Sequence, residues 1–410
     1  MKKYWSFIEE YSILLLFGTF IALLWANSSY YDYNSFVNFV LFTNQYIGFV
    51  NDVGLKEITI LFVVNEFLMP FFFAIAGKEI WEAIILKNGS LRGQKAVTPI
   101  ITTIGGIVVP ACIYLAVSHY FGTEIYKSIQ HGWAVSIATD IAFSFLVGRI
   151  IFGPNHPAVA FLLLLAVADD ALGLIIIAVN YPTKELQLEY LLYAVVACYL
   201  GYLLLNKKLK INNYVPYVLF GCFSWFCFYK SGLHPALGLL PMIPMLPHAE
   251  SDLGIFSEKE SSSTDCLNKF EHSIKPFVEV ILFLFGLVNA GVVFSAIGET
   301  TWAVTIGLLI GKPLGIFVFA LLSVYLLRLK LPDGMNFKDV FVVGQISGIG
   351  FTVSLFVASV AFAPGILQDM AKMGALFSFF GIVLSFIWAK LLKIEKRWIK
   401  ELLNFRSSFS

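Results

Sequence analysis

Charged residues are scarce in this chain. Only 13% of its 410 residues are charged, 58% are hydrophobic, and the mean hydropathy is +0.80. A soluble domain carries about 25% charged residues, so this composition excludes an ordinary water-soluble protein. The sequence also lacks a hydrophilic stretch long enough to form a separate soluble domain. We therefore predict an all-α, polytopic membrane protein whose main partner is the lipid bilayer.

Cysteine is also rare, and the sequence contains neither a CxxC spacing nor a cluster of histidines. These absences disfavour a disulfide framework and a metal centre. We expect no cofactor and no nucleic-acid partner. The cysteines are interpreted as reduced structural residues. They are Cys112, Cys198, Cys222, Cys227 and Cys266.

The most informative segment covers residues 161–179, which are apolar except for Asp169 and Asp170 in the middle. A helix of this length crosses the roughly 30 Å hydrocarbon core of a bilayer, so both carboxylates would lie near the midplane. Each central Asp costs about 2.5 to 3.5 kcal/mol on insertion scales, unless water, a cation or a basic residue compensates it. The pair is therefore predicted to bind ions. Helix capping by backbone groups is the structural alternative.

The hydropathy pattern predicts twelve membrane spans. Most Lys and Arg residues fall in alternate loops, which places both termini in the cytoplasm. A cleaved signal peptide is the alternative for the first span, but Glu9, Glu10 and the span's length favour a retained helix. The predicted spans are residues 11–29, 59–86, 96–119, 131–149, 157–180, 188–206, 213–229, 233–247, 274–297, 301–327, 338–361 and 371–392.

Two connecting segments have features of their own. Residues 44–60 contain two β-rich runs around Asn51-Asp52-Val53-Gly54, which predicts a small extracytoplasmic β-hairpin. Its edges could pair with a second copy, although an ordinary surface hairpin is the alternative. Residues 248–273 are Ser-rich and acidic, and are predicted to form a flexible cytoplasmic loop. The loop could be regulatory, but a solvated linker is favoured.

Two further charges lie inside predicted spans. Asp140 follows Ser136 and Thr139, whose hydroxyls could ligate an ion or cap a broken helix. Lys312 precedes Pro313 in an otherwise apolar span. A buried lysine requires a carboxylate partner, and the excess of acids over this base could hold protons or a metal ion. A lysine that snorkels to the membrane surface is the alternative.

The eleventh span is rich in glycine, with Gly344, Gly348 and Gly350 close together. Glycine at this density is typical of an unwound crossing, but also of close helix packing through small residues. In transporters built from inverted repeats, interrupted helices at corresponding positions indicate the binding site. Spans three to five and ten to twelve would then form the repeated core, with the fourth and eleventh spans interrupted.

Five motifs occur in the order expected for a known family. They are ATDIAFSFLVG around Asp140, LAVADDALGLIIIA around Asp169 and Asp170, KSGLHPALG around His234, LLIGKPLG around Lys312, and GIGFTVSLFVAS in the eleventh span. Together they resemble the NhaA sodium/proton antiporters over almost the whole chain. The resemblance implies a fold with two inverted three-helix repeats and two discontinuous crossing helices. It also implies electrogenic exchange of Na⁺ or Li⁺ for protons across the bacterial inner membrane.

Residue roles follow from the same resemblance. Asp169 and Asp170 would bind the transported Na⁺, and Lys312 would pair with Asp169. Asp140 and Thr139 would be the polar groups at the helix crossing. The hairpin at residues 44–60 would make a homodimer.

The sequence departs from the family at two places that the resemblance associates with pH activation. The usual Gly-Leu-Glu-Val-Lys-Arg-Glu run reads Gly-Lys-Glu-Ile-Trp-Glu-Ala here, which keeps Glu79 but lacks the basic pair. Glu271 and His272 are present, but Lys275 stands where a second His is frequent. The sequence therefore does not fix the pH range over which the protein becomes active. The candidates for pH regulation are Glu79, Glu82, His234, Glu271 and His272.

Three rivals remain for comparison. An intramembrane aspartyl protease needs aspartates on separate helices in a GxGD setting, and a prenyl-transferring enzyme typically needs DDxxD. The sequence around Asp140, Asp169 and Asp170 fits neither pattern. We therefore expect a transporter and not an enzyme. A sodium-coupled symporter of an organic anion on the same fold is the closest chemical rival.

Overall fold

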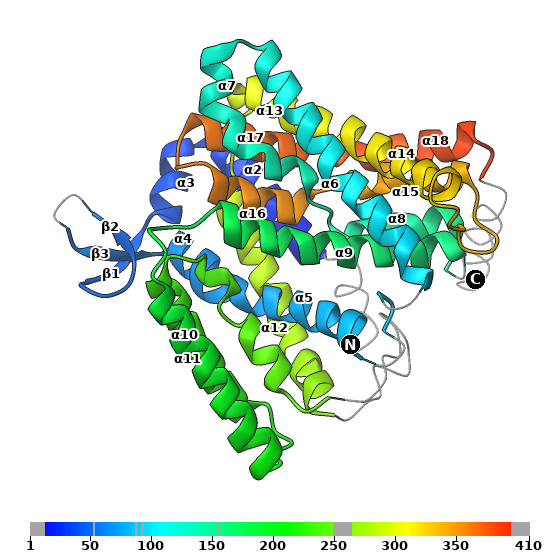
Figure 1. Cartoon of the computed structure of the whole chain (residues 1–410). Coiled ribbons are helices and arrows are strands. Elements are labelled where there is room, and N and C mark those ends of the chain that lie inside the picture. The colour runs from blue at the N-terminus through cyan, green and yellow to red at the C-terminus, as the bar shows by residue number, and fades with distance from the viewer. Residues whose placement is uncertain are drawn as a thin grey trace, which may run out of the picture. The chain divides into compact units, whose positions relative to one another are not determined.

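The fold is described by a computed structural model. It covers residues 13–51, 54–86, 89–91, 94–154, 156–248 and 265–394. The described chain is mostly helical (Figure 1). It divides into two compact units, unit 1 with Met1–Ser90 and Leu174–Val293, and unit 2 with Leu91–Gly173 and Phe294–Ser410. Most of the predicted loop at 248–273, namely residues 249–264, lies outside the described residues.

The helices confirm a multi-pass membrane protein. Six described helices are long and apolar enough to cross a bilayer, and two bent helix pairs bring this number to eight. The six spans are Ile60–Ile85, Ala96–Tyr120, Pro157–Asn180, Leu188–Lys208, Glu299–Tyr325 and Ile366–Leu391. The other four predicted spans coincide with shorter or less apolar helices of unit 1.

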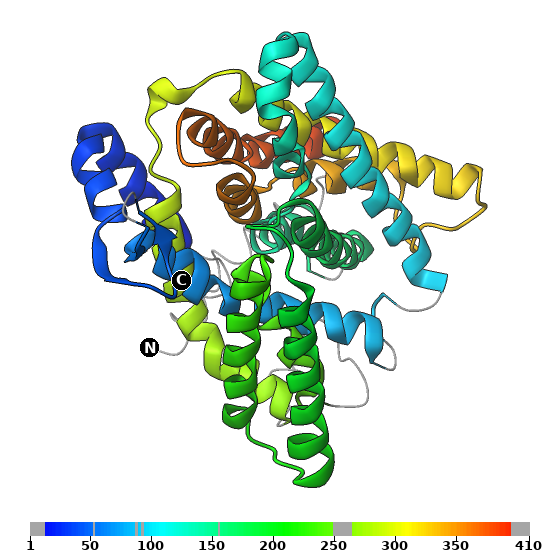
Figure 2. The same cartoon turned by 60° about the vertical axis from the view of Figure 1, so that its left-hand side comes forward.

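Unit 1 is built from helices that pack in pairs. Helix α12 packs along α2, and α10 along α11 in a pair that both views show (Figure 2). At the first contact, a Cβ on Gly18 would collide with the backbone of Phe283, so only glycine allows this approach. The helices are α2 (Ile13–Ser28), α3 (Tyr30–Val37), α4 (Ile60–Phe62), η1 (Val63–Leu68), α5 (Met69–Ile85), α10 (Leu188–Gly201), η3 (Tyr202–Lys208), α11 (Val215–Ser231), η4 (Pro235–Leu237), η5 (Leu240–Met245) and α12 (Cys266–Asn289).

Unit 1 also contains a small antiparallel sheet with the strand order β1-β3-β2. Its strands are β1 (Val40–Asn44), β2 (Phe49–Val50) and β3 (Lys56–Thr59). Strands β2 and β3 lie within the predicted hairpin, whereas β1 begins before it and takes the other side of β3. The sequence prediction missed β1 because its pairing with β3 joins segments that are not adjacent along the chain.

Unit 2 contains both bent helix pairs. The first joins Thr123–Ile137 to Ile141–Phe152 at an angle of 50°, and the second joins Phe337–Ser347 to Phe351–Ala361 at 49°. Its helices are α6 (Gln94–Tyr120), α7 (Thr123–Ile129), η2 (Gln130–Ile137), α8 (Ile141–Phe152), α9 (Pro157–Asn180, with its second part in unit 1), η7 (Phe294–Ala296), α13 (Glu299–Ile306), η8 (Gly307–Gly311), α14 (Lys312–Tyr325), α15 (Phe337–Ser347), α16 (Phe351–Ala361), α17 (Ile366–Phe377) and α18 (Phe380–Leu391).

Both interpretations of the glycine-rich eleventh span apply, at different positions. The helix is interrupted between α15 and α16, where Gly348 and Gly350 lie. Gly344 lies in α15 and allows close packing, because a Cβ there would lie 2.9 Å from the Cα of Pro313. The glycines thus permit the break and the approach of α15 to α14.

Candidate functional site

Lys312 lies at the centre of the buried polar groups of unit 2. It is the first residue of α14, directly after the π-helical turn η8, and its side chain is fully buried. Its Nζ donates a hydrogen bond to Asp169 Oδ2 at 2.6 Å and another to Thr139 Oγ1. Asp169 is also buried. A buried charge without a partner costs several kcal/mol, so each residue makes the burial of the other possible.

Thr139 connects this ion pair to the second bent helix. It lies in the break between η2 and α8, and its Oγ1 donates to the backbone oxygen of Ser347 at 3.1 Å. Ser347 is the last residue of α15, where the helix carries partial negative charge. The ammonium group of Lys312 is therefore connected through one hydroxyl to a helix C-terminus, where a positive charge is favourable.

Asp140, the next residue in the chain, contacts the N-terminal ends of two helices, α8 and α16. It is the N-cap of α8, with Oδ1 accepting a hydrogen bond from Phe143 N at 3.2 Å. Its Oδ2 accepts from Thr352 N at 3.1 Å and from Thr352 Oγ1, at the start of α16. Its own backbone N donates to Ile349 O at 2.8 Å. One carboxylate thus compensates the positive ends of two half-helices.

Asp170 differs from Asp169 in its surroundings. Successive helix residues point about 100° apart, and Asp170 is only half-buried whereas Asp169 is buried. Asp170 interacts electrostatically with Lys312, whose direct carboxylate partner is Asp169. Two carboxylates and one ammonium group leave the site with one negative charge when both acids are ionised. That charge is the chemical requirement for holding one proton or one monovalent cation.

The structure divides the predicted core residues into two adjoining groups. Asp169, Lys312 and Thr139 contact one another directly, whereas Asp140 contacts the helix ends. Sequence reasoning assigned Thr352 no role at the site. Its position in the glycine-rich GIGFT run, just after the break, was a usable signal, because Thr and Ser often satisfy polar groups at helix starts.

Two of the predicted pH-regulation residues meet in unit 1. Lys78 is buried, and its Nζ lies 2.6 Å from Glu82 Oε2 and 2.8 Å from Glu271 Oε2. Glu79 is half-buried on the same helix, and His272 is exposed. Sequence reasoning assigned Lys78 no role, although it lies within the predicted span 59–86. Because its ammonium group contacts Glu82 of α5 and Glu271 of α12, Lys78 is a cation that links these two helices.

The ionisation of Glu271 follows from these contacts. Burial alone would raise its pKa, but the charge and hydrogen bond of Lys78, together with Lys275, outweigh burial and lower the pKa below its usual value. Glu271 is therefore ionised at neutral pH, and its cluster with Lys78 is a charged clamp.

His234 lies elsewhere in unit 1. It is buried at the start of η4, where its Nδ1 accepts a hydrogen bond from Ala236 N at 3.3 Å. Its Nε2 lies 3.7 Å from Glu66 Oε1. Glu66 is buried, and sequence reasoning missed it, although an acid inside the predicted span 59–86 was a signal.

A buried ion pair between two membrane helices, hydrogen-bonded to the break of a bent helix whose next residue is a charged cap, is typical of secondary active ion transporters. The sequence model described as Na⁺/H⁺ antiporter 1 matches residues 4–392, and the chain belongs to this family. It is 50% identical to the Na⁺/H⁺ antiporter NhaA of Jannaschia sp. (strain CCS1), over 97% of this chain and all of that protein. It is 42% identical to that of Geotalea uraniireducens (strain Rf4), over 97% and 99% of the two chains.

A solved structure, the sodium proton antiporter MjNhaP1 from Methanocaldococcus jannaschii, aligns at 15% identity with a TM-score of 0.49. The alignment covers 81% of this chain and 84% of that one.

Proposed function

We propose that this protein is a secondary active antiporter that exports Na⁺, or Li⁺, in exchange for protons at Asp169, Asp170 and Lys312. The observation that carries the proposal is the buried Asp169–Lys312 pair with the half-buried Asp170 beside it. Membership of the Na⁺/H⁺ antiporter 1 family supports the same ions. The chain would act as a transporter without a cofactor, in the bacterial inner membrane.

Charge balance at the site supports electrogenic exchange. In the proton-loaded state, Asp170 carries one proton and Lys312 another, and the ion pair with Asp169 leaves the site neutral. When Na⁺ binds between the two carboxylates, Asp170 and Lys312 both release protons, and the site carries one negative charge. The two states differ by one charge, so each cycle moves net charge across the membrane. A hard cation such as Na⁺ needs several oxygen ligands, which the carboxylates begin to supply.

Alternating access would come from the crossing of the two bent helices. Asp140 ties the starts of α8 and α16, and Thr139 ties Lys312 to the end of α15, so movement at the crossing would change the site. Inverted repeats are supported by a reciprocal contact between α6 and α14. A Cβ on Gly105 would meet Gly315 O, and one on Gly315 would meet Gly105 O, as a twofold relation requires.

The topology and assembly belong to the same proposal. The hydropathy pattern supports twelve spans, and the loop distribution of Lys and Arg would place both termini in the cytoplasm. The sheet would then lie on the extracytoplasmic side of the membrane and pair with a second copy. Exposed apolar side chains on the sheet, among them Leu41, Phe42 and Val50, support a homodimer contact there. Regulation by pH would involve Glu79, Glu82, His234, Glu271 and His272.

The proposal is tested with the full chain in proteoliposomes. Proton movement is followed by an internal pH dye after addition of Na⁺, Li⁺ or K⁺ over a pH series, at zero and at imposed membrane potential. We expect external Na⁺ to enter the vesicles in exchange for protons that leave, which raises the internal pH at a rate that the membrane potential changes. Asp170→Asn is the inactive control. A flat response to every cation would refute exchange, whereas dependence on an added organic anion would favour the symporter.

A further inference from the structure

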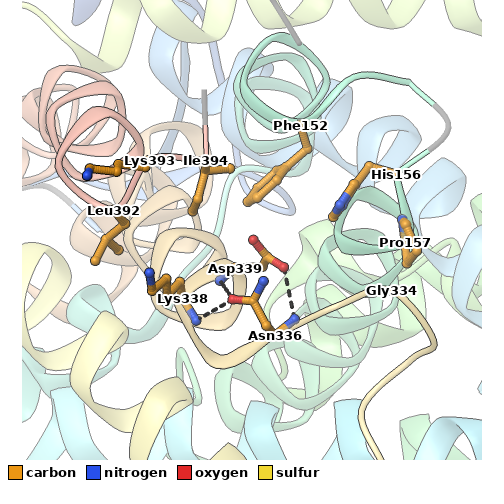
Figure 3. A pocket seen from close by; sticks show the side chains of 10 residues that line it. All are labelled: Phe152, His156, Pro157, Gly334, Asn336, Lys338, Asp339, Leu392, Lys393 and Ile394. Carbon is orange, nitrogen blue, oxygen red and sulfur yellow. Dashed lines mark hydrogen bonds between the residues drawn. The ribbon is translucent and has the colours of Figure 1, made fainter. Parts of the chain in front are cut away.

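Unit 2 contains a cavity of about 600 Å³ where the ends of four helices, α8, α9, α15 and α18, come together. Phe152 comes from the end of α8, and His156 and Pro157 from the start of α9. The loop before α15 and the first turn of α15 add Gly334, Asn336, Lys338 and Asp339, and the chain after α18 adds Leu392, Lys393 and Ile394 (Figure 3). The volume lies within the range of small-molecule sites.

The charged groups of the cavity favour an anion. Lys338 and Lys393 are exposed, and neither forms an ion pair within 4 Å in the part of the chain that the structure describes. His156 Nδ1 accepts a hydrogen bond from Ala158 N at 3.2 Å, which assigns the ring proton to Nε2 and leaves it as a donor. His156 also stacks on Phe152, with ring centroids 5.3 Å apart.

Asp339 is the one carboxylate among the described lining residues, and it already accepts a hydrogen bond from the backbone. Its Oδ2 accepts a hydrogen bond from Asn336 N at 2.9 Å, while Asn336 Oδ1 accepts from Lys338 N and Asp339 N. This capping box places the acid at the positive end of α15, which offsets its charge. Asp339 also interacts electrostatically with Lys338 and His156, so it balances one of the two lysine charges and leaves the lining with a net positive charge.

The apolar part of the lining selects among anions. Phe152, Leu392 and Ile394 form an apolar wall beside the cationic groups, at helix ends where a membrane helix meets the headgroup layer. Such a combination suits an amphiphile with a phosphate. A vestibule for Na⁺ is disfavoured, because two lysines at its wall would repel the cation.

We propose that this cavity binds the phosphate headgroup of an anionic phospholipid, held by Lys338, Lys393 and His156, with its glycerol and first methylenes against Phe152, Leu392 and Ile394. The site is separate from Asp169, Asp170 and Lys312, and its occupancy does not depend on the exchange reaction. Anionic lipids of the inner leaflet are attracted by juxtamembrane lysines.

The test titrates the purified full-length protein in detergent with phosphatidylglycerol and follows the apparent melting temperature. We expect saturable stabilisation, with the apparent affinity of the variant K338Q/K393Q weaker by about tenfold or more. The matched control, K207Q/K208Q, removes two exposed lysines at the end of η3 and should bind as the wild type does. Equal weakening in both double variants would overturn the proposal, because it would indicate unspecific charge attraction.

Two further arms identify the ligand. Asp339→Asn removes the acid but keeps a capping oxygen, so we expect tighter lipid binding; weaker binding would mean a cation site and overturn the proposal. Inorganic phosphate should stabilise far less than the lipid, because it cannot use the apolar wall. Equal stabilisation by inorganic phosphate would overturn the proposal that the bound phosphate group belongs to a lipid. The readout is unfolding, so it is independent of whether the protein exchanges Na⁺ for protons.

Discussion

Lys312 and Asp169 form an ion pair of 2.6 Å although 143 residues separate them in the chain. The pair joins α14 to α9, and Thr139 adds the break of the first bent helix as a third element. A charge change at this pair therefore acts on three elements at once. This is the physical link between ion binding and the conformational change that transport requires.

Replacement of Lys312 by Ala should lower both stability and transport. Asp169 would remain buried without its cation, and breaking a buried pair in this way costs about 3 to 5 kcal/mol. We expect a clear fall in the melting temperature in detergent and loss of Na⁺-driven proton flux. Lys127→Ala is the control, because its pair with Glu124 has side chains 68% and 86% exposed and contributes little. Unchanged melting and exchange in Lys312→Ala would show that Lys312 is not a buried partner.

Replacement of Asp140 by Asn should weaken the site without destroying it. Asn keeps an acceptor oxygen for Phe143 N or Thr352 N, but loses the charge that faces two helix starts. Each such interaction stabilises by about 0.3 to 1 kcal/mol. We expect apparent Na⁺ affinity a few-fold lower and a modest fall in melting temperature. The exposed Asp333→Asn should change neither. Complete loss of Na⁺ binding in Asp140→Asn would make Asp140 an obligatory ligand.

Asp169 and Asp170 should respond differently to the same change. Asp170→Asn should abolish Na⁺-driven proton movement, because it removes the carboxylate that alternates between proton and cation. Asp169→Asn frees Lys312 to carry a proton by itself, so we expect some exchange with altered charge stoichiometry. Stoichiometry is measured from the reversal potential in proteoliposomes. Equal loss in both variants would contradict the division of roles.

The clamp of Lys78, Glu82 and Glu271 should determine how acid affects stability. Because the folded-state pKa of Glu271 is lowered, its contribution is present above its unfolded pKa of about 4.3 and is lost as the pH falls through the folded value. The melting temperature of the wild type should therefore fall as the pH is lowered.

Lys78→Met should reverse this trend, because burial without the cation raises the pKa of Glu271, and acid then relieves the buried charge. Melting temperatures from pH 4 to 8 compare the variant with Lys275→Met, whose Nζ lies 4.0 Å from Glu271 Oε1. Parallel pH profiles in wild type and Lys78→Met would show that the clamp does not stabilise the fold.

Much of the helical framework could be predicted from local sequence, since a span needs only length and apolar composition. The second span was predicted at 59–86 and is observed at Ile60–Ile85. The two breaks were also foreseeable, because Asp140 and the glycines around Gly348 disfavour a continuous helix there. Strand β1 was missed because its partner β3 lies beyond a turn and another strand.

The contacts of the site were less accessible than its residues. Intramembrane charges identified Asp140, Asp169 and Lys312, because their burial is too costly without a function. That Thr352 would meet Asp140 depends on how two helix breaks cross, which neither sequence segment encodes alone. The place of Lys78 between Glu82 and Glu271 likewise depends on the packing of α5 against α12.

Competition between Na⁺ and protons should make the apparent Na⁺ affinity depend on pH. A proton and a Na⁺ ion cannot share the carboxylate of Asp170, so each proton that must leave adds its own pH dependence. At pH values where the site is mostly protonated, the affinity should improve about tenfold per pH unit for each competing proton. A slope near two protons would assign one to Asp170 and one to Lys312, which lies against Asp169. Isothermal titration calorimetry in buffers of different ionisation enthalpy measures both the affinity and the protons released. A Na⁺ affinity independent of pH, with no proton release, would rule out competition even if Asp170→Asn is inactive.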